Sequence, residues 1–353
     1  MNSYSLFSQI LHNQFLSKND FTNFLIKRIL RKSKAINLES LEYIFITGLA
    51  RAGTTSLLES ISELKGFGSL RYKYMPFTLS PTLAKIYNRH FYKPNFSSSE
   101  RMHNDGLRIS LESAECLDEP YWIQSLFKDN NKEFMEPHTV SKDLAKGYGY
   151  ILDYFLKIEN KERLVIKNNN NHLRLISLSK FFLKSKFLVV FRSPLSQARS
   201  LLNVHEKISK KQTQEKFILE YMNLIGHWEF GKGKKPFIYK KEQINILKEI
   251  NESNLNYWLE QWIYTYEWLL KVISSHKTNN IFLICYEDLC GSEKYESKIF
   301  KNLNINLVQK RFKFQLGKSN LLNSNELENS RIKYASEIYN SLREKSFQDN
   351  KIL

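Results

Sequence analysis

The sequence predicts an α/β protein with a doubly wound, mainly parallel β-sheet flanked by helices. Four short apolar runs rich in β-branched residues alternate with segments of helical periodicity, a pattern typical of parallel sheets. The runs are apolar almost throughout, as expected of strands buried on both faces. The chain has 353 residues, of which 42% are hydrophobic, enough for one large domain with helical and loop insertions.

The elements can be placed in chain order. Residues 14–34 mix apolar and basic positions, which indicates either a helix docked on the core or a helix on a membrane surface. Ser193 followed by Pro194 marks a helix start, because serine caps N-termini and proline fits the first turn. Strands are expected at residues 43–48, 163–167, 186–192 and 281–286. Further helices are expected at residues 55–64, 173–183, 255–273 and 325–348.

Three regions are predicted along the chain: an N-terminal helical extension over 1–40, the main domain over 41–320, and a C-terminal helical tail over 321–353. The segment 229–252 is rich in lysine and contains Gly231, Gly233 and Pro236, so we expect an insertion or a mobile loop over the site. Residues 67–105 are expected to be irregular and to carry substrate-facing loops.

Composition limits the ligands and the location. The formal net charge of +17 favours an anionic ligand, although a lysine-biased, solvated surface would give the same charge. The three cysteines form no CxxC pair, which indicates a reducing compartment without a disulfide framework or zinc site. No signal peptide or long apolar run is evident, so we expect a cytoplasmic protein without a transmembrane segment. The run 168–171 of four asparagines is interpreted as compositional drift.

The loop 48–56 carries the strongest motif, Gly-Leu-Ala-Arg-Ala-Gly-Thr-Thr-Ser. It lies between an expected strand and an expected helix, where backbone N–H groups can surround a phosphate. It is similar to a Walker loop, but Thr54 occupies the lysine position, which argues against ATP or GTP hydrolysis. Arg51 can supply positive charge instead. A tight strand–helix turn with a capping threonine is the alternative.

A second motif joins Arg192, at the end of an expected strand, to Ser200, eight positions later. Ser200 would lie about two turns along the next helix, so both side chains can face the carboxyl edge of the sheet, where α/β folds bind ligands. Arginine is a bidentate phosphate donor. An ordinary surface ion pair at Arg192 is the alternative.

With both motifs in this order, the chain resembles the PAPS-dependent sulfotransferases of the bacterial and Golgi-type branch, which have a P-loop-like fold. Residues 50–55, Ala-Arg-Ala-Gly-Thr-Thr, are similar to the family's 5′-phosphosulfate loop, and Arg192 with Ser200 to its 3′-phosphate motif. The resemblance covers about residues 40–290 and includes the segments 71–77, 103–107 with 112–122, 164–167 and 285–289.

Three positions depart from the family pattern. Ala50 stands where proline is usual, and Ser193 where aspartate is common. Asn169 occupies the position of the catalytic histidine in the cytosolic small-molecule branch, which puts that branch in doubt and leaves the general base unassigned.

The resemblance implies a site for PAPS, with no metal. The 5′ end would be held by Arg51, Ala52, Gly53, Thr54, Thr55 and Ser56, and the 3′-phosphate by Arg192 and Ser200. Arg51 and Lys167 would stabilise charge on the leaving phosphate.

Candidate bases are His103 and Asp105, then Glu115 and His172, each with a structural role as the alternative. The acceptor would be a hydroxyl on a carbohydrate or cell-envelope molecule. No nucleic-acid partner is expected, and peripheral membrane contact stays open.

Two other functions stay open: a P-loop small-molecule kinase, and a non-catalytic protein that binds a nucleotide or an anionic polysaccharide. The missing Walker lysine and the lack of a clear acidic magnesium ligand argue against the kinase. Lys167 beside the two phosphate motifs argues against a protein that only binds. The aromatic stripe Trp258, Trp262 and Tyr266 is expected to be core.

Overall fold

The computed structural model describes residues 5–91, 99–100, 108–126, 132–276, 279–305, 314 and 328–350. A five-stranded parallel sheet lies at its centre, with the strand order β2-β5-β1-β6-β7. The α/β class, the parallel sheet and the four expected strands are confirmed. The strands are β1 (Ile44–Thr47), β2 (Phe67–Gly68), β5 (Arg163–Lys167), β6 (Lys186–Phe191) and β7 (Ile281–Cys285).

The register of the sheet places the ends of β1 and β5 together. Ile46 of β1 lies opposite Lys167 of β5 on one side and opposite Leu188 of β6 on the other. The loop after β1 and the last residue of β5 therefore meet at one edge. The strand order reverses around β1, because β2 and β5 lie on one side of it and β6 and β7 on the other. Such a switch point is where open α/β sheets bind ligands.

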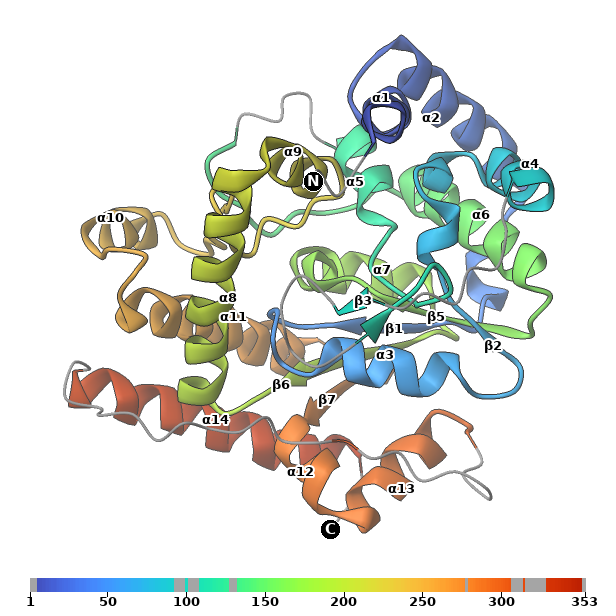
Figure 1. Ribbon diagram of the computed structural model, residues 1–353. Helices are drawn as coiled ribbons and strands as arrows, with labels where there is room; N and C mark the ends of the chain where they lie inside the picture. Colours follow the sequence, from blue (N-terminus) through green and yellow to red (C-terminus); the bar gives the residue numbers. More distant parts are fainter. Residues whose placement is uncertain are drawn as a thin grey trace.

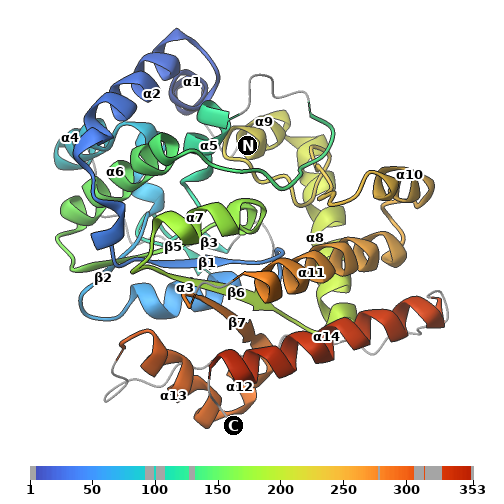
Figure 2. The same cartoon turned by 180° about the vertical axis from the view of Figure 1, so that it is seen from behind.

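Helices cover both faces of the sheet (Figures 1 and 2). Both views place α3 on one face and α7 on the other. Helix α8 packs against α11, and α14 packs against β7 and α11. The α-helices of the central region are α3 (Thr54–Ser62), α4 (Pro81–Phe91), α5 (Glu119–Leu126), α6 (Lys142–Glu159), α7 (Leu175–Phe181), α8 (Pro194–Gln214), α9 (Lys216–Leu224), α10 (Glu242–Glu249) and α11 (Leu255–Ser275). The remaining ones are α1 (Leu6–Leu16), α2 (Asp20–Lys32), α12 (Tyr286–Gly291), α13 (Glu293–Asn302) and α14 (Asn329–Asp349).

The N-terminal helices dock on the rest of the molecule. In α2, Leu25 and Ile29 are buried against the main core, while Arg31 and Lys32 lie in its last turn, where basic side chains suit the helix dipole. Helix α1 leaves Leu6 and Phe7 exposed. None of the helices in the described part of the chain combines the length and the apolar character that a membrane crossing requires.

Short elements complete the fold. An antiparallel pair joins β3 (Ser99–Glu100) to β4 (Arg108–Ile109). Single 3-10 turns lie at Ser33–Ala35, Leu38–Ser40, Tyr72–Tyr74, Phe77–Leu79 and Asn169–Arg174. The segment 229–252 contains α10, and it pairs with the chain near Met135, which donates to the Pro236 carbonyl and accepts from the Ile238 N–H. Mobility of this segment stays a prediction.

Candidate active site

The loop 48–56 leaves β1 through Gly48, whose backbone has φ +128°. A Cβ atom at Gly48 would lie 2.2 Å from the Val190 carbonyl oxygen of β6, far inside any real contact. Glycine is needed here because the loop turns directly against the neighbouring strand. The first glycine of the motif thus holds the loop at the carboxyl edge of the sheet.

Gly53 is the second fixed point of the loop. It has φ +99° and is the N-cap position of α3. The ring of Tyr286, the first residue of α12, lies where a Cβ atom of Gly53 would project, 2.2 Å from its Cδ2. The side chain of Tyr286 is also hydrogen-bonded to that of Ser56 in the first turn of α3. The tyrosine of the 285–289 motif therefore clamps the loop that the 50–55 motif forms.

Helix α8 holds the other side of the loop through Gln197. Its Nε2 donates to the carbonyl oxygens of Leu49 at 3.0 Å and Ala50 at 2.9 Å. Trp262 of α11 donates from Nε1 to Gln197 Oε1 at 3.1 Å, and Trp258, Trp262 and Tyr266 are all buried. The aromatic stripe is therefore core, as expected, and it supports the loop through Gln197.

The loop presents groups suited to an anion. The first N–H groups of α3 have no partner within the helix, and the helix dipole adds positive potential at this end. Arg51 has a left-handed backbone with φ +68°. Its Nε donates to Ser200 Oγ of α8 at 3.1 Å. The loop motif and the helix motif, 149 residues apart in sequence, thus meet through one hydrogen bond.

Arg192 directly follows β6 at the same edge. Its Nε is buried and has no hydrogen-bond partner among the residues that the structure describes. The Nε atom lies 3.9 Å from Glu287 Oε1, too far for a hydrogen bond. A buried guanidinium N–H without a partner has capacity for an anionic ligand.

Ser193 begins α8 as expected, but its side chain makes no capping bond. Its backbone N–H donates to Glu287 Oε1 at 2.9 Å instead. The acidic pair of the 285–289 motif is structural: Glu287 also accepts from the Tyr339 hydroxyl, and Asp288 from Arg343.

Lys167 ends β5 and is almost fully buried. Its Nζ lies 2.8 Å from Glu115 Oε1, and the two side chains are 5% and 2% exposed. Glu115 Oε1 also accepts the Cys116 N–H at 2.8 Å. Glu115, one of the expected base candidates, is thus the counter-ion of Lys167 in this structure.

The asparagine run 168–171 is buried and hydrogen-bonded within the candidate site. Its interpretation as compositional drift was therefore wrong. All four side chains are buried. Asn168 donates to Glu119 Oε2 at 2.8 Å, and Asn170 to the Gly226 carbonyl at 3.0 Å. Asn171 Oδ1 accepts from Arg174 Nε at 2.9 Å. The bonds of Asn168 and Asn170 connect the end of β5 to two distant segments, and the bond to Arg174 lies within the same 3-10 turn.

Asn169 links the loop to a carboxylate that sequence reasoning missed. Its Oδ1 accepts from Thr54 Oγ1 at 3.3 Å, and its Nδ2 donates to Glu229 Oε1 at 2.8 Å. Glu229 is 60 residues away in sequence and lies in a segment without a motif. Two signals could have pointed to it: position 169, where the family pattern of one branch has histidine, and the segment 229–252, which was expected to lie over the site and begins with Glu229.

His172 lies in the same 3-10 turn, fully buried. Its Nδ1 lies 2.6 Å from the Asn169 carbonyl oxygen and its Nε2 2.7 Å from the Tyr239 hydroxyl. Burial lowers the pKa of His172 to about 4. Both ring nitrogens are engaged by the protein itself, so the side chain has a structural role.

The neutral His172 predicts acid sensitivity. Its pKa lies below the unfolded value of 6.5, so the unfolded chain binds the proton more tightly, and stability is lost as the pH falls through this range. We expect the difference in unfolding free energy between the wild type and His172→Gln to shrink by about 3 kcal/mol from pH 7 to pH 4. Urea unfolding at each pH measures it, and a constant difference would contradict the assignment.

His103 and Asp105, the first base candidates, lie outside the described residues, so their role stays a prediction. In the described ranges, no group of three or more histidine, cysteine, aspartate or glutamate side chains is arranged to hold a metal ion.

Comparison with known proteins adds two solved structures. No protein-family model matches the chain, and no curated protein matches it. The chain is similar to sulfotransferase STF1 from Mycobacterium tuberculosis H37Rv, with 13% identity over 98% of this chain and 90% of that one, and a TM-score of 0.42. It is also similar to sulfotransferase STF9 from Mycobacterium avium, with 10% identity over 98% and 84% of the two chains, and a TM-score of 0.40.

Proposed function

We propose that this chain is a sulfotransferase that moves a sulfuryl group from PAPS to a hydroxyl acceptor, a carbohydrate or another cell-envelope molecule. The observation that carries the proposal is the 3.1 Å hydrogen bond between Arg51 and Ser200. It joins the two motifs that the resemblance assigns to the two ends of one donor. A cytoplasmic location stays a prediction.

The residues present suit a donor that has one anionic group at its 5′ end and another at its 3′ position. In the proposed complex, the backbone N–H groups of residues 52–55 and the hydroxyls of Thr54, Thr55 and Ser56 hold the 5′-phosphosulfate. Arg192 and Ser200 hold the 3′-phosphate; the Nε of Arg192 is in an ion pair with Glu287 but makes no hydrogen bond among the described residues. Arg51 belongs to the loop and donates to Ser200, so in the proposed complex it can contact either group.

The transfer is an in-line displacement at sulfur. The acceptor oxygen forms a bond to sulfur, while the bridging bond to the 5′-phosphate breaks and the phosphate takes the electron pair. Negative charge grows on that leaving oxygen, and preorganised cations stabilise it. Lys167 and Arg51 supply this charge. Glu115 holds the Lys167 side chain in place inside the protein, with 2.8 Å between Nζ and Oε1.

A P-loop kinase and a protein that only binds anions are the two competing functions. Thr54 occupies the lysine position and its side chain is neutral, so this position supplies no cation for triphosphates. Thermal unfolding with adenosine 3′,5′-bisphosphate or with ATP–Mg²⁺ separates the candidates, because a ligand of the native state raises the melting temperature. Stronger stabilisation by ATP–Mg²⁺ would overturn the proposal, and radiolabelled sulfate transfer to a native glycan and lipid extract would exclude mere binding.

Arg192→Ala should weaken the binding of adenosine 3′,5′-bisphosphate at least tenfold, because a charge-assisted phosphate contact is lost. Adenosine 5′-phosphosulfate, which lacks the 3′-phosphate, should bind both proteins equally. Isothermal titration with both nucleotides measures the effect. Arg199→Ala, which removes an arginine within α8, is the matched control. Equal bisphosphate affinity in the Arg192 and Arg199 variants would show that Arg192 is not the 3′-phosphate contact.

A further inference from the structure

Glu229 is a carboxylate with one oxygen used and one unused. Oε1 accepts from Asn169 Nδ2 at 2.8 Å. Oε2 is buried and has no hydrogen-bond partner within the described part of the chain. A buried carboxylate oxygen without a donor is costly to a protein, so its presence beside the loop calls for a ligand that donates a proton there.

A small cavity lies beside this carboxylate. It has a volume of about 10 Å³, room for about one water-sized group. Its walls include Leu49 of the loop, Glu229 and, from the following segment, Pro236. A hydroxyl group of a ligand would fit this space and could donate to the unused oxygen of Glu229.

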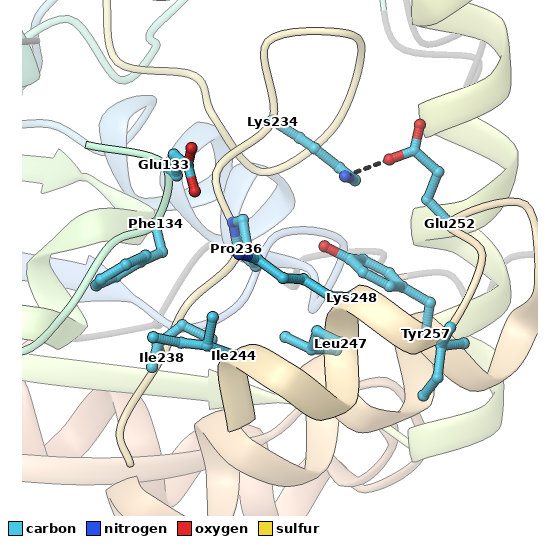
Figure 3. A pocket seen from close by; sticks show the side chains of 11 residues that line it. Glu133, Phe134, Lys234, Pro236, Ile238, Ile244, Leu247, Lys248, Glu252 and Tyr257 are labelled. Carbon is cyan, nitrogen blue, oxygen red and sulfur yellow. Dashed lines mark ion pairs between the residues drawn. The ribbon is translucent and has the colours of Figure 1, made fainter. Parts of the chain in front are cut away.

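A larger cavity adjoins the small one. Both are lined by Lys234, Pro236 and Tyr257. The larger cavity has a volume of about 280 Å³ and lies between α10, the start of α11 and the chain around residue 134 (Figure 3). Its apolar lining consists of Phe134, Pro236, Ile238, Ile244, Leu247, Ile250 and Tyr257.

The cavity is also lined by four charged residues, Glu133, Lys234, Lys248 and Glu252. Lys234 forms an ion pair with Glu252, and Lys248 belongs to α10 (Figure 3). Glu133 and Lys248 are exposed, whereas Leu247 is buried. An apolar interior with a polar rim suits a ligand that has an apolar part and a polar part.

We propose that these two cavities form the acceptor site and that the acceptor is an amphiphilic alcohol. Its apolar chain fills the larger cavity, and its hydroxyl lies in the small one, beside the loop. Glu229 Oε2 takes the hydroxyl proton as the acceptor oxygen bonds to sulfur, and adenosine 3′,5′-bisphosphate leaves with the electron pair of the broken bond. This inference rests on the proposed function and narrows its acceptor to a glycolipid-like class.

Binding of n-alkyl β-glucosides, from propyl to octyl and below their micelle concentrations, tests the cavity without any transfer reaction. We expect the affinity to rise about fourfold for each added methylene until the cavity is full. Ile244→Trp should fill the cavity and weaken the binding of octyl glucoside at least tenfold. Ile246→Trp, on the exposed face of the same helix, should bind like the wild type. Affinity independent of chain length, or equal affinity in both variants, would overturn the proposal.

Transfer from PAPS to octyl glucoside tests Glu229. Glu229→Gln should lower kcat at least 100-fold, as expected for loss of a general base, while octyl glucoside and adenosine 3′,5′-bisphosphate keep their affinities. Glu249→Gln, an exposed carboxylate of α10 that lines neither cavity, is the matched control and should keep its kcat. A kcat within threefold of wild type for Glu229→Gln would show that Glu229 is not the general base, and His103 and Asp105 would again be the candidates.

Failure of this inference differs from failure of the proposed function. A wild type that binds the bisphosphate but transfers sulfate to none of the glucosides would overturn the amphiphilic acceptor alone. A wild type that shows the chain-length dependence but does not bind the bisphosphate would overturn the sulfotransferase proposal and leave the cavity assignment in place.

Discussion

Replacing Lys167 by methionine should abolish sulfuryl transfer and destabilise the fold at the same time. The ammonium group and Glu115 are 2.8 Å apart and almost fully buried, so the substitution leaves a carboxylate in the interior without its counter-ion. Breaking a buried pair in this way costs about 3–5 kcal/mol. If Lys167 stabilises the leaving oxygen as proposed, its loss should lower kcat by about 100- to 1,000-fold or more. Urea unfolding and PAPS turnover measure the two effects separately.

The double variant Lys167→Met with Glu115→Gln separates stability from catalysis. Because both charges are removed together, no unpaired charge stays buried, and much of the lost unfolding free energy should return. Activity should not return, since the cation is still absent. A double variant no more stable than Lys167→Met would show that the carboxylate is not the source of the destabilisation. An active double variant would exclude Lys167 from the stabilisation of the leaving group.

The strands and the loop could be predicted from sequence because the signals for them are local. A β-branched run followed by Gly48 predicts a strand and a turn without reference to the rest of the chain. β2 was missed because its two residues, Phe67–Gly68, are too few to show any period. Helix α4 was missed because its first residue, Pro81, was taken as a sign of irregular structure, although proline is favourable in the first turn of a helix.

The candidate site could be predicted only as far as its motifs reach. Arg51, Lys167, Arg192 and Ser200 belong to motifs, and the structure places Arg51 against Ser200 and pairs Lys167 with Glu115. Glu229 belongs to no motif. Its role depends on a bond to Asn169 across 60 residues of sequence, and such long-range contacts leave no periodic or compositional pattern. The same holds for the contact of Tyr286 with Gly53.

Gly53→Ala should remove donor binding. The added Cβ would lie 2.2 Å from a ring carbon of Tyr286, and the backbone at φ +99° strains any side chain. Neither defect can be relieved without moving the loop, because Gln197 holds its other end. We expect adenosine 3′,5′-bisphosphate to bind at least 100-fold more weakly, and the protein to lose about 2–4 kcal/mol of unfolding free energy. Isothermal titration and urea unfolding measure both.

Two further variants show which part of this effect comes from the tyrosine ring. Gly291→Ala is the control, since nothing lies within 4 Å of a Cβ at that position, and it should bind the bisphosphate like the wild type. Gly53→Ala combined with Tyr286→Ala removes the ring but keeps the positive φ. It should therefore recover part of the stability and little of the affinity, because the strained backbone still misplaces the N–H groups that start α3. Full recovery of affinity would mean that Gly53 is required only to make room for Tyr286, and that the loop's own backbone geometry is not what binds the donor.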